Sequence, residues 1–347
     1  MQALTFRGVQ AIACEQLPDP AILEPGDAIV EVVASAICGS DLHTYHGREP
    51  VDAGTVMGHE FVGRVVEAGT AARGLARGDL VVSPFTTCCG SCFYCRSGLT
   101  ARCRAGQLFG FRREGSGLHG AQARYVRVPL AETTLVRLPA DLRPDAGLLL
   151  GDVLATGHFC ARNAEVGPHG CYAIVGCGPV GLMAIVAARA LGAERLFAID
   201  SVPERLALAE RWGARPLRVD REDVHAAIAE ATEGRGADAV LELVGSLGAA
   251  RLAYDLVRPG GTLSVVGVHY EDRFAFSPAE AYDKNLTYRV GRCPARRLID
   301  ELLPLARLRQ DELALLFTHR LPLARGADGY AIFAGRQDGC IKVLLEP

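Results

Sequence analysis

The chain has 347 residues and a formal net charge of -3, with 49% hydrophobic and 22% charged residues. This composition is typical of a globular enzyme, and the length suits about two domains. The slightly acidic balance gives no electrostatic case for nucleic-acid binding, and no apolar run reaches the roughly twenty residues of a membrane helix. We therefore expect a small-molecule partner, with no role for nucleic acid or a membrane.

The first part of the chain, up to about residue 150, contains short β-branched runs separated by Gly, Pro and Asp. This pattern predicts the strands of a β-rich or barrel-like unit. The predicted strands are 28–37, 61–69, 79–85 and 123–129.

Four cysteines then follow within fifteen residues in the pattern C-x2-C-x2-C-x7-C. Four thiolates at this spacing can enclose one tetrahedral zinc and leave no open position, which indicates a structural site. The alternatives are disulfides or unrelated reduced thiols. The N-terminal residues lack the basic segment and apolar core of a secretory signal, so we expect a cytoplasmic chain with thiols available for metal. The four residues are Cys89, Cys92, Cys95 and Cys103.

A different pattern begins near residue 171, where apolar strands alternate with helical segments. Such alternation predicts βαβ units and a parallel sheet. The expected strands are 172–176, 195–200, 237–245 and 261–267, and the expected helices are 179–193, 203–214 and 225–234. Beyond them we expect a helix at 295–308 and a terminal strand at 340–346.

The first strand of this alternating region leads into a turn with the spacing G-x-G-x-x-G, and a helix follows the turn. Glycines in this context let the backbone approach a pyrophosphate, while the helix N-terminus offers N–H donors to the phosphates. The turn residues expected to bind the cofactor are Gly176, Gly178, Val180 and Gly181.

Asp200 ends the next predicted strand, nineteen residues after Gly181. Its carboxylate would accept hydrogen bonds from the adenosine ribose hydroxyls and repel a 2′-phosphate, which favours NAD over NADP. Alternatively, Asp200 caps the helix that starts near Pro203. Arg205 could flank the same ribose or lie on a solvated helix face.

Two further segments, CGSDLH (38–43) and GHE (58–60), contain candidate metal ligands. Cys38 and His59 suit zinc, and a third protein ligand would leave one position for water or substrate. A lone cysteine or histidine is usually a core residue. The combination with a structural zinc and a dinucleotide fold favours an open, catalytic zinc.

Together these motifs resemble the zinc-dependent medium-chain alcohol dehydrogenases of the medium-chain dehydrogenase/reductase superfamily, over the whole chain. The resemblance is carried by CGSDLH, GHEFVGRVVEAG (58–69), the cysteine run and GCGPVG. It implies an α/β fold in which a Rossmann doubly wound parallel sheet is inserted into a chaperonin-10-like β-rich catalytic domain. The implied domains are 1–152, with a structural zinc lobe at 88–104, then the NAD-binding domain 153–288, and the return to the catalytic domain at 289–347.

The resemblance also implies a catalytic zinc held by Cys38, His59 and Asp152. Many relatives carry cysteine at the third place, so Asp152 is a departure from the commonest pattern. The alternative is that Asp152 caps the helix beginning with VLATGHF. Glu60 adjoins the metal in the family and can visit it during ligand exchange, and Asp41 would orient His59.

The implied activity is reversible hydride transfer between an alcohol and NAD, with two Zn2+ per chain, one catalytic and one structural. Ser40 and His43 would relay the proton through the cofactor ribose, although they could also be two ordinary polar residues. Glu60 completes the set of implied catalytic residues.

The remaining expectations concern binding contacts and assembly. The implied cofactor contacts are Thr156, Val266, Val268 and Lys342, and the implied wall of the substrate pocket is Phe85 and Thr86. Lys342 would also lie near Glu60. A polyol, threonine or formaldehyde dehydrogenase is the alternative enzyme, and a catalytically silent NAD-binding protein is the alternative outside enzymes. The resemblance favours a homotetramer or homodimer.

Overall fold

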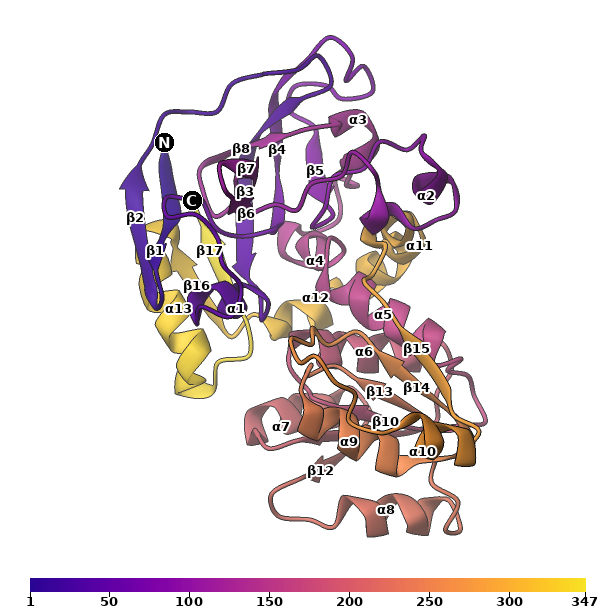
Figure 1. Ribbon diagram of the computed structural model, residues 1–347. Coiled ribbons are helices and arrows are strands. Elements are labelled where there is room, and N and C mark those ends of the chain that lie inside the picture. Colours follow the sequence, from indigo (N-terminus) through magenta and orange to yellow (C-terminus); the bar gives the residue numbers. More distant parts are fainter. The chain divides into compact units, whose positions relative to one another are not determined.

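Two segments far apart in the sequence, Met1–Ala155 and Pro294–Pro347, form one compact unit, and Thr156–Cys293 forms a second. The structure is a computed structural model that describes all residues from 1 to 347. Both chain ends belong to the first unit (Figure 1). No helix combines the length and apolar character needed to cross a membrane.

The second unit is built on a six-stranded sheet in which every neighbouring pair is parallel. The strand order is β12-β11-β10-β13-β14-β15, so the direction of winding reverses between β10 and β13. This is the Rossmann order, and it confirms the predicted parallel sheet. The strands are β10 (Cys171–Val175), β11 (Arg195–Asp200), β12 (Arg215–Arg218), β13 (Ala237–Glu242), β14 (Val257–Val265) and β15 (Thr287–Val290).

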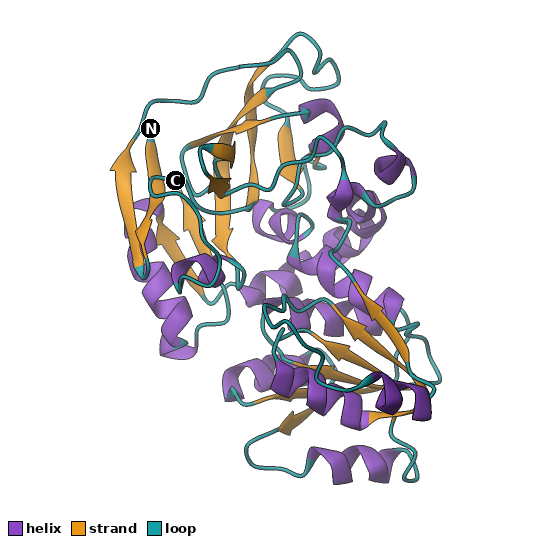
Figure 2. Cartoon of the chain, viewed as in Figure 1, coloured by secondary structure: helices purple, strands orange, loops and turns teal.

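Helices cover both faces of this sheet (Figure 2). Every residue of β10 is buried, as expected for a central parallel strand between two helical layers. The side chains of Val175, Ile199 and Leu263 contribute to one apolar core that joins the strands to the helices. The helices are α5 (Val153–Asn163), which starts in the first unit, α6 (Pro179–Ala190), α7 (Pro203–Arg211), α8 (Val224–Ala231), α9 (Leu247–Leu256) and α10 (Pro278–Asp283).

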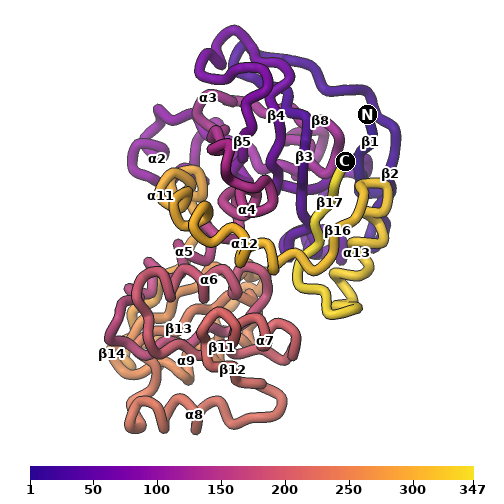
Figure 3. The backbone as a smooth tube through the Cα atoms, turned by 180° about the vertical axis from the view of Figure 1, so that it is seen from behind, coloured from indigo at the N-terminus to yellow at the C-terminus, as the bar shows by residue number.

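The first unit is built on a seven-stranded sheet with the order β16-β17-β3-β4-β5-β9, and β8 also pairs with β3. The C-terminal strand β17 pairs antiparallel with β3, opposing Leu344 to Ala36. In Figure 3 the yellow end of the chain therefore runs beside indigo β3. The strands are β3 (Ala28–Ile37), β4 (Glu60–Ala68), β5 (Leu80–Ser83), β8 (Tyr125–Val128), β9 (Val136–Arg137), β16 (His319–Pro322) and β17 (Val343–Glu346).

Smaller elements complete the first unit. Two hairpins are β1 (Gln2–Gly8) with β2 (Ala11–Gln16), and β6 (Phe111–Arg113) with β7 (Ser116–Leu118). The α-helices are α1 (Asp41–Tyr45), α2 (Phe93–Arg96), α3 (Ala131–Thr134), α4 (Pro144–Leu149), α11 (Ala295–Leu308), α12 (Gln310–Leu313) and α13 (Gly326–Gly335). Single 3-10 turns are η1 (Thr100–Arg102), η2 (Ala314–Leu316), η3 (Leu323–Arg325) and η4 (Gln337–Gly339).

Candidate metal centres and dinucleotide site

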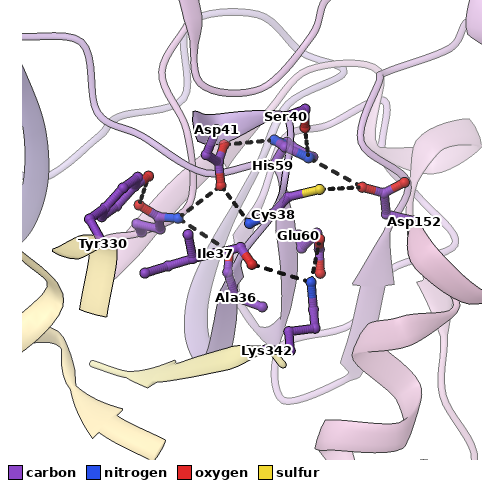
Figure 4. Close-up of polar contacts among 11 residues, drawn as sticks. Ala36, Ile37, Cys38, Ser40, Asp41, His59, Glu60, Asp152, Tyr330 and Lys342 are labelled. Carbon is purple, nitrogen blue, oxygen red and sulfur yellow. Dashed lines mark hydrogen bonds and ion pairs between the residues drawn. The ribbon is translucent and has the colours of Figure 1, made fainter. Parts of the chain in front are cut away.

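The end of β3 and the start of β4 bring four potential metal ligands together (Figure 4). Ala36 of β3 opposes Glu60 of β4, so Cys38, just beyond β3, lies beside His59, just before β4. Asp152 joins them from the residue before α5. One ligand atom from each of Cys38, His59, Glu60 and Asp152 lies within 4.8 Å of the others.

Two glycines explain how the backbone reaches this arrangement. Gly58 has a φ of +88°, and a Cβ there would lie 2.4 Å from the Gln122 side chain. Gly151 packs against β5, where a Cβ would lie 2.2 Å from the Ser83 carbonyl oxygen. Any larger residue at either position would displace His59 or Asp152, because each glycine directly precedes a candidate ligand.

The His59 ring is oriented by Asp41. Its Nδ1 donates to the Asp41 carboxylate at 3.1 Å, which leaves Nε2 directed toward Asp152 Oδ2 at 3.2 Å. Ser40 Oγ lies 3.2 Å from the same Nε2. Burial lowers the pKa of His59, but the charge of Asp41 and hydrogen bonds to Asp152 and Asp41 outweigh it and hold this pKa well above its usual value. Fixing Nδ1 in this way prepares Nε2 as a metal ligand.

A buried hydrogen-bond chain continues behind Asp41. Asp41 Oδ2 accepts from the Cys38 backbone N–H at 2.9 Å and from Gln122 Nε2 at 3.4 Å. Gln122 Oε1 in turn accepts from the Tyr330 hydroxyl at 2.8 Å, and neither Gln122 nor Tyr330 is exposed to solvent. Neither residue was expected from the sequence, because they lie 208 positions apart and belong to no motif.

Glu60 and Lys342 form an ion pair on the other side of the ligands. Lys342 Nζ lies 2.8 Å from Glu60 Oε1, and both side chains are 0% exposed. Glu60 Oε2 is buried and has no hydrogen-bond partner. Burial raises the pKa of Glu60, Lys342 acts against it, and Asp152 adds to the rise. A buried carboxylate oxygen with no partner, beside other ligand atoms, is a group that a cation would satisfy.

The chemistry of the donor set fits zinc. Burial, followed by the charges of Asp152 and Glu60, raises the pKa of the Cys38 thiol to about 11. Burying a thiolate beside two carboxylates costs a large free energy unless a cation binds among them. Sulfur, imidazole nitrogen and carboxylate oxygen are the ligands that zinc takes in proteins.

The second group of ligands lies in the cysteine run, where Cys89, Cys92, Cys95 and Cys103 place their sulfur atoms within 4.8 Å of one another. Cys103 Sγ accepts from the Cys89 backbone N–H at 3.2 Å, and Cys89 Sγ accepts from the Cys92 N–H at 3.4 Å. Hydrogen bonds from the Ser91 side chain and from backbone N–H groups lower the pKa of the Cys89 thiol to about 6. All twelve cysteines of the chain are free thiols, so disulfides do not explain this cluster.

The neighbouring Cys88 is not part of the cluster. Its thiol donates to the Thr133 carbonyl oxygen at 3.3 Å, and the residue is buried. The cluster is therefore a closed set of four sulfurs, which fits a structural zinc.

The glycine turn of the second unit has the tight geometry that its spacing predicts. Gly176 has a φ of +92°, and a Cβ at Gly181 would lie 1.9 Å from the Gly176 carbonyl oxygen. Gly178 is the N-cap residue of α6, whose second residue is Val180. The turn therefore leads directly into the N-terminus of a twelve-residue helix, where backbone N–H groups can receive a phosphate.

Asp200 stands at the end of β11, beside this turn. Its Oδ2 accepts from the Cys177 backbone N–H at 2.7 Å, and its Oδ1 accepts from the N–H groups of Ser201 and Val202. Val202 is the N-cap residue of α7, and no side chain caps that helix. Asp200 thus joins the glycine turn to the segment before α7, while the Arg205 guanidinium lies 3.7 Å from its carboxylate.

The other predicted residues lie in both units. His43 is in α1, where burial and then the charge of Arg48 lower its pKa. Phe85 and Thr86 are buried just after β5, and the Phe85 N–H donates to the Gly151 carbonyl beside Asp152. In the second unit, Thr156 lies in α5, and Val266 and Val268 follow β14, with Val268 46% exposed.

Comparison with known proteins places this site in a family. Residues 24–140 match the alcohol dehydrogenase GroES-like domain, and residues 179–306 match the zinc-binding dehydrogenase domain. The chain is 42% identical over 341 residues to zinc-type alcohol dehydrogenase B of Aspergillus flavus, covering 96% of this chain and 78% of that protein. The chain belongs to the zinc-type alcohol dehydrogenase family. It is accordingly a zinc-dependent oxidoreductase of alcohols, and its Rossmann fold implies the use of NAD.

Solved structures agree with this assignment. Alcohol dehydrogenase TADH from Thermus sp. ATN1 is 39% identical and aligns with a TM-score of 0.94 over 100% of this chain and 99% of that chain. The 2R,3R-butanediol dehydrogenase from Bacillus subtilis is 28% identical, with a TM-score of 0.85 over 100% of this chain and 99% of that chain. Both domains of this dehydrogenase therefore have structural counterparts.

Proposed function

We propose that Cys38, His59 and Asp152 hold the catalytic zinc and that the four clustered cysteines hold the structural zinc. The observation that carries this proposal is the convergence of four ligand atoms within 4.8 Å at the junction of β3, β4 and α5. A zinc ion bound there would lower the pKa of an alcohol hydroxyl and polarise a carbonyl group. Glu60, whose Oε2 has no hydrogen-bond partner, would coordinate the zinc transiently during ligand exchange.

The protein groups around this site suit the handling of a proton. Ser40 Oγ lies beside His59 Nε2, which places a hydroxyl at the edge of the ligand group. We assign Ser40 and His43 to the proton relay, since a histidine with a lowered pKa is a neutral acceptor near pH 7. Phe85 and Thr86 would form the wall of the substrate pocket, next to the segment that carries Asp152.

In the second unit, the glycine turn would receive the pyrophosphate and Asp200 the adenosine ribose. Asp200 carries the preference for NAD over NADP, because its carboxylate would repel a 2′-phosphate. Thr156, Val266 and Val268 would contact the nicotinamide, and Arg205 would flank the ribose. Lys342 would act mainly on Glu60, because the two side chains form a fully buried ion pair.

The substrate would be a small alcohol or the corresponding aldehyde or ketone. A vicinal diol is the second candidate, supported by the structural likeness to 2R,3R-butanediol dehydrogenase. A homotetramer or homodimer and a cytoplasmic location complete the proposal, the latter supported by the twelve free thiols.

Metal analysis of one variant tests the catalytic site. Asp152→Ala should retain one zinc per chain, that of the cysteine cluster, and lose nearly all alcohol-dependent NADH formation. Asp152→Cys is the matched control, because it supplies the ligand that many relatives use, and it should keep two zinc ions. Two zinc ions and full turnover in Asp152→Ala would refute the ligand assignment.

A second variant tests the cofactor preference. Asp200→Gly should weaken NAD binding much more than NADP binding, measured by titration calorimetry. Equal affinities for NAD in the variant and the parent chain would remove Asp200 from the ribose site.

A further inference from the structure

Glu242, the last residue of β13, is a buried carboxylate that neither the motifs nor the proposed mechanism uses. It is 0% exposed. Its Oε1 accepts from the backbone N–H groups of Val244 at 2.9 Å and Gly245 at 2.8 Å, and its Oε2 lies 3.1 Å from His269 Nε2. One carboxylate therefore binds both the loop after β13 and a side chain from the loop after β14.

These two loops lie beside the glycine turn. A Cβ at Gly176 would lie 2.4 Å from the Val244 side chain, so the loop after β13 packs on the turn. A Cβ at Gly245 would lie 2.3 Å from the Val268 carbonyl oxygen, so the same loop also touches the loop after β14. The strand order reverses between β10 and β13, and open α/β sheets bind their ligands at such a point, beyond the carboxyl ends of the strands.

The two halves of the sheet would receive different halves of a dinucleotide. Asp200 is on β11, so the adenosine half belongs to the side of β10, β11 and β12. The loops after β13 and β14 then belong to the other mononucleotide, the one that carries the nicotinamide. Glu242 and His269 hold these loops together.

The charges around His269 favour a stable contact between His269 and Glu242. His269 is 25% exposed and Glu242 is fully buried, and Glu271 approaches the other ring nitrogen of His269 at 3.6 Å. Hydrogen bonding to Glu242 raises the pKa of His269, which favours the charged imidazolium. A buried carboxylate that loses its charged partner is strongly penalised, so the loops would rearrange if His269 were removed.

We propose that Glu242 and His269 are positioning residues that hold the loops after β13 and β14 in the geometry required by the nicotinamide half of the cofactor. This inference rests on the proposed function, namely that the second unit binds NAD. It assigns roles to two residues that the G-x-G-x-x-G motif does not include.

Binding of NADH and of AMP to the full-length protein tests the proposal, because AMP occupies only the adenosine half. His269→Ala and Glu242→Gln should each weaken NADH binding about tenfold or more, as expected for the loss of a charged hydrogen bond. Their affinity for AMP should stay within about twofold of the parent value. His269→Gln keeps an N–H donor for Glu242 and should recover part of the NADH affinity.

His225→Ala is the matched control, since His225 is an exposed histidine of α8 in the same unit, and it should change neither affinity. Unchanged NADH binding in His269→Ala would overturn the proposal. So would an equal loss of NADH and AMP binding, because that would indicate general damage to the unit. If the parent protein bound neither ligand, the proposed dinucleotide site itself would fail and this inference with it.

Discussion

Lys342 Nζ lies 2.8 Å from Glu60 Oε1 in a space that admits no solvent to either side chain. Lys342 comes from the residue before β17, and Glu60 begins β4, so the pair spans 282 positions of the sequence. The ammonium group balances the carboxylate of Glu60, which is one of the four potential metal ligands. The charge of the metal site is therefore set partly from the C-terminal segment.

Removal of Lys342 should be costly for stability. Lys342→Met would leave the Glu60 carboxylate buried without a partner, and we expect a loss of about 3–5 kcal/mol in the free energy of unfolding. The double variant Lys342→Met, Glu60→Gln removes both charges and should recover much of that loss. Urea titrations of the three proteins would measure the effect, and equal stability of the single variant and the parent would contradict it.

The hydrogen bond from Tyr330 to Gln122 should affect zinc binding at a distance. Tyr330→Phe removes the hydroxyl that fixes Gln122 behind Asp41, so the orientation of His59 would be less well defined. Changes to groups that orient metal ligands typically cost about 10- to 100-fold in metal affinity, and a loss toward the lower end is expected here. Competition with a chromogenic chelator would measure it. Tyr45→Phe is the control, because Tyr45 contacts the Tyr330 ring from α1 and belongs to a different residue pair from Tyr330 and Gln122. Equal zinc affinity in both variants would exclude the effect.

The zinc of the cysteine cluster should matter for the stability of the chain more than for the chemical step. Cys92→Ser removes one ligand of the closed site, so the chain should lose one zinc and unfold at a lower temperature. At low temperature, where the variant stays folded, its activity per folded molecule should remain near that of the parent chain. The folded fraction and the zinc content would be determined on the same sample. Cys88→Ser, which changes the neighbouring thiol outside the cluster, should retain both zinc ions. Loss of the chemical step without loss of the cluster zinc would argue against this division of roles.

The pH dependence of stability should reveal the charge of His269. Its pKa in the folded chain is raised above 6.5 by the hydrogen bond to Glu242 and, after opposing burial, by the charges of Glu242 and Glu271. The resulting stabilisation is fully present below pH 6.5 and is lost as pH rises through the folded pKa. The difference in unfolding free energy between the parent and His269→Gln should therefore shrink as pH rises from about 6. Urea titrations at several pH values would measure it, and a constant difference would contradict the charged pair.

The sequence predicted the parts of the fold that rest on local patterns. The strand expected at 28–37 is β3, and the helix expected at 295–308 is α11. The glycine turn was found because its spacing, strand and helix are consecutive. By contrast, β12 was missed: its four residues, RPLR, contain proline and two arginines and gain their place by pairing with β11.

In the metal site, too, the sequence predicted local features but not the contacts between distant segments. Cys38 and His59 stand in recognisable segments, whereas the partners that orient them come from distant places. Gln122 lies in a segment with no chemical signature, and Tyr330 reads as one more apolar residue of a helix. Gln122 and Tyr330 meet only because the C-terminal segment returns to the first unit, where β17 pairs with β3 and α13 packs against both strands. Sequence patterns encode neighbours along the chain, and this network depends on neighbours in space.

The insertion of β17 between β16 and β3 also sets an order of events during synthesis. The ribosome must complete the entire Rossmann unit before it produces the strand that pairs with Ile37 and Ala36. Until then, β8 pairs with the first part of β3, but the last part, at Ser35–Ile37, has no partner strand on that edge. Glu60 also lacks its Lys342 partner until then. During synthesis, this last part of β3 should therefore be open to unwanted strand pairing until β17 has been made.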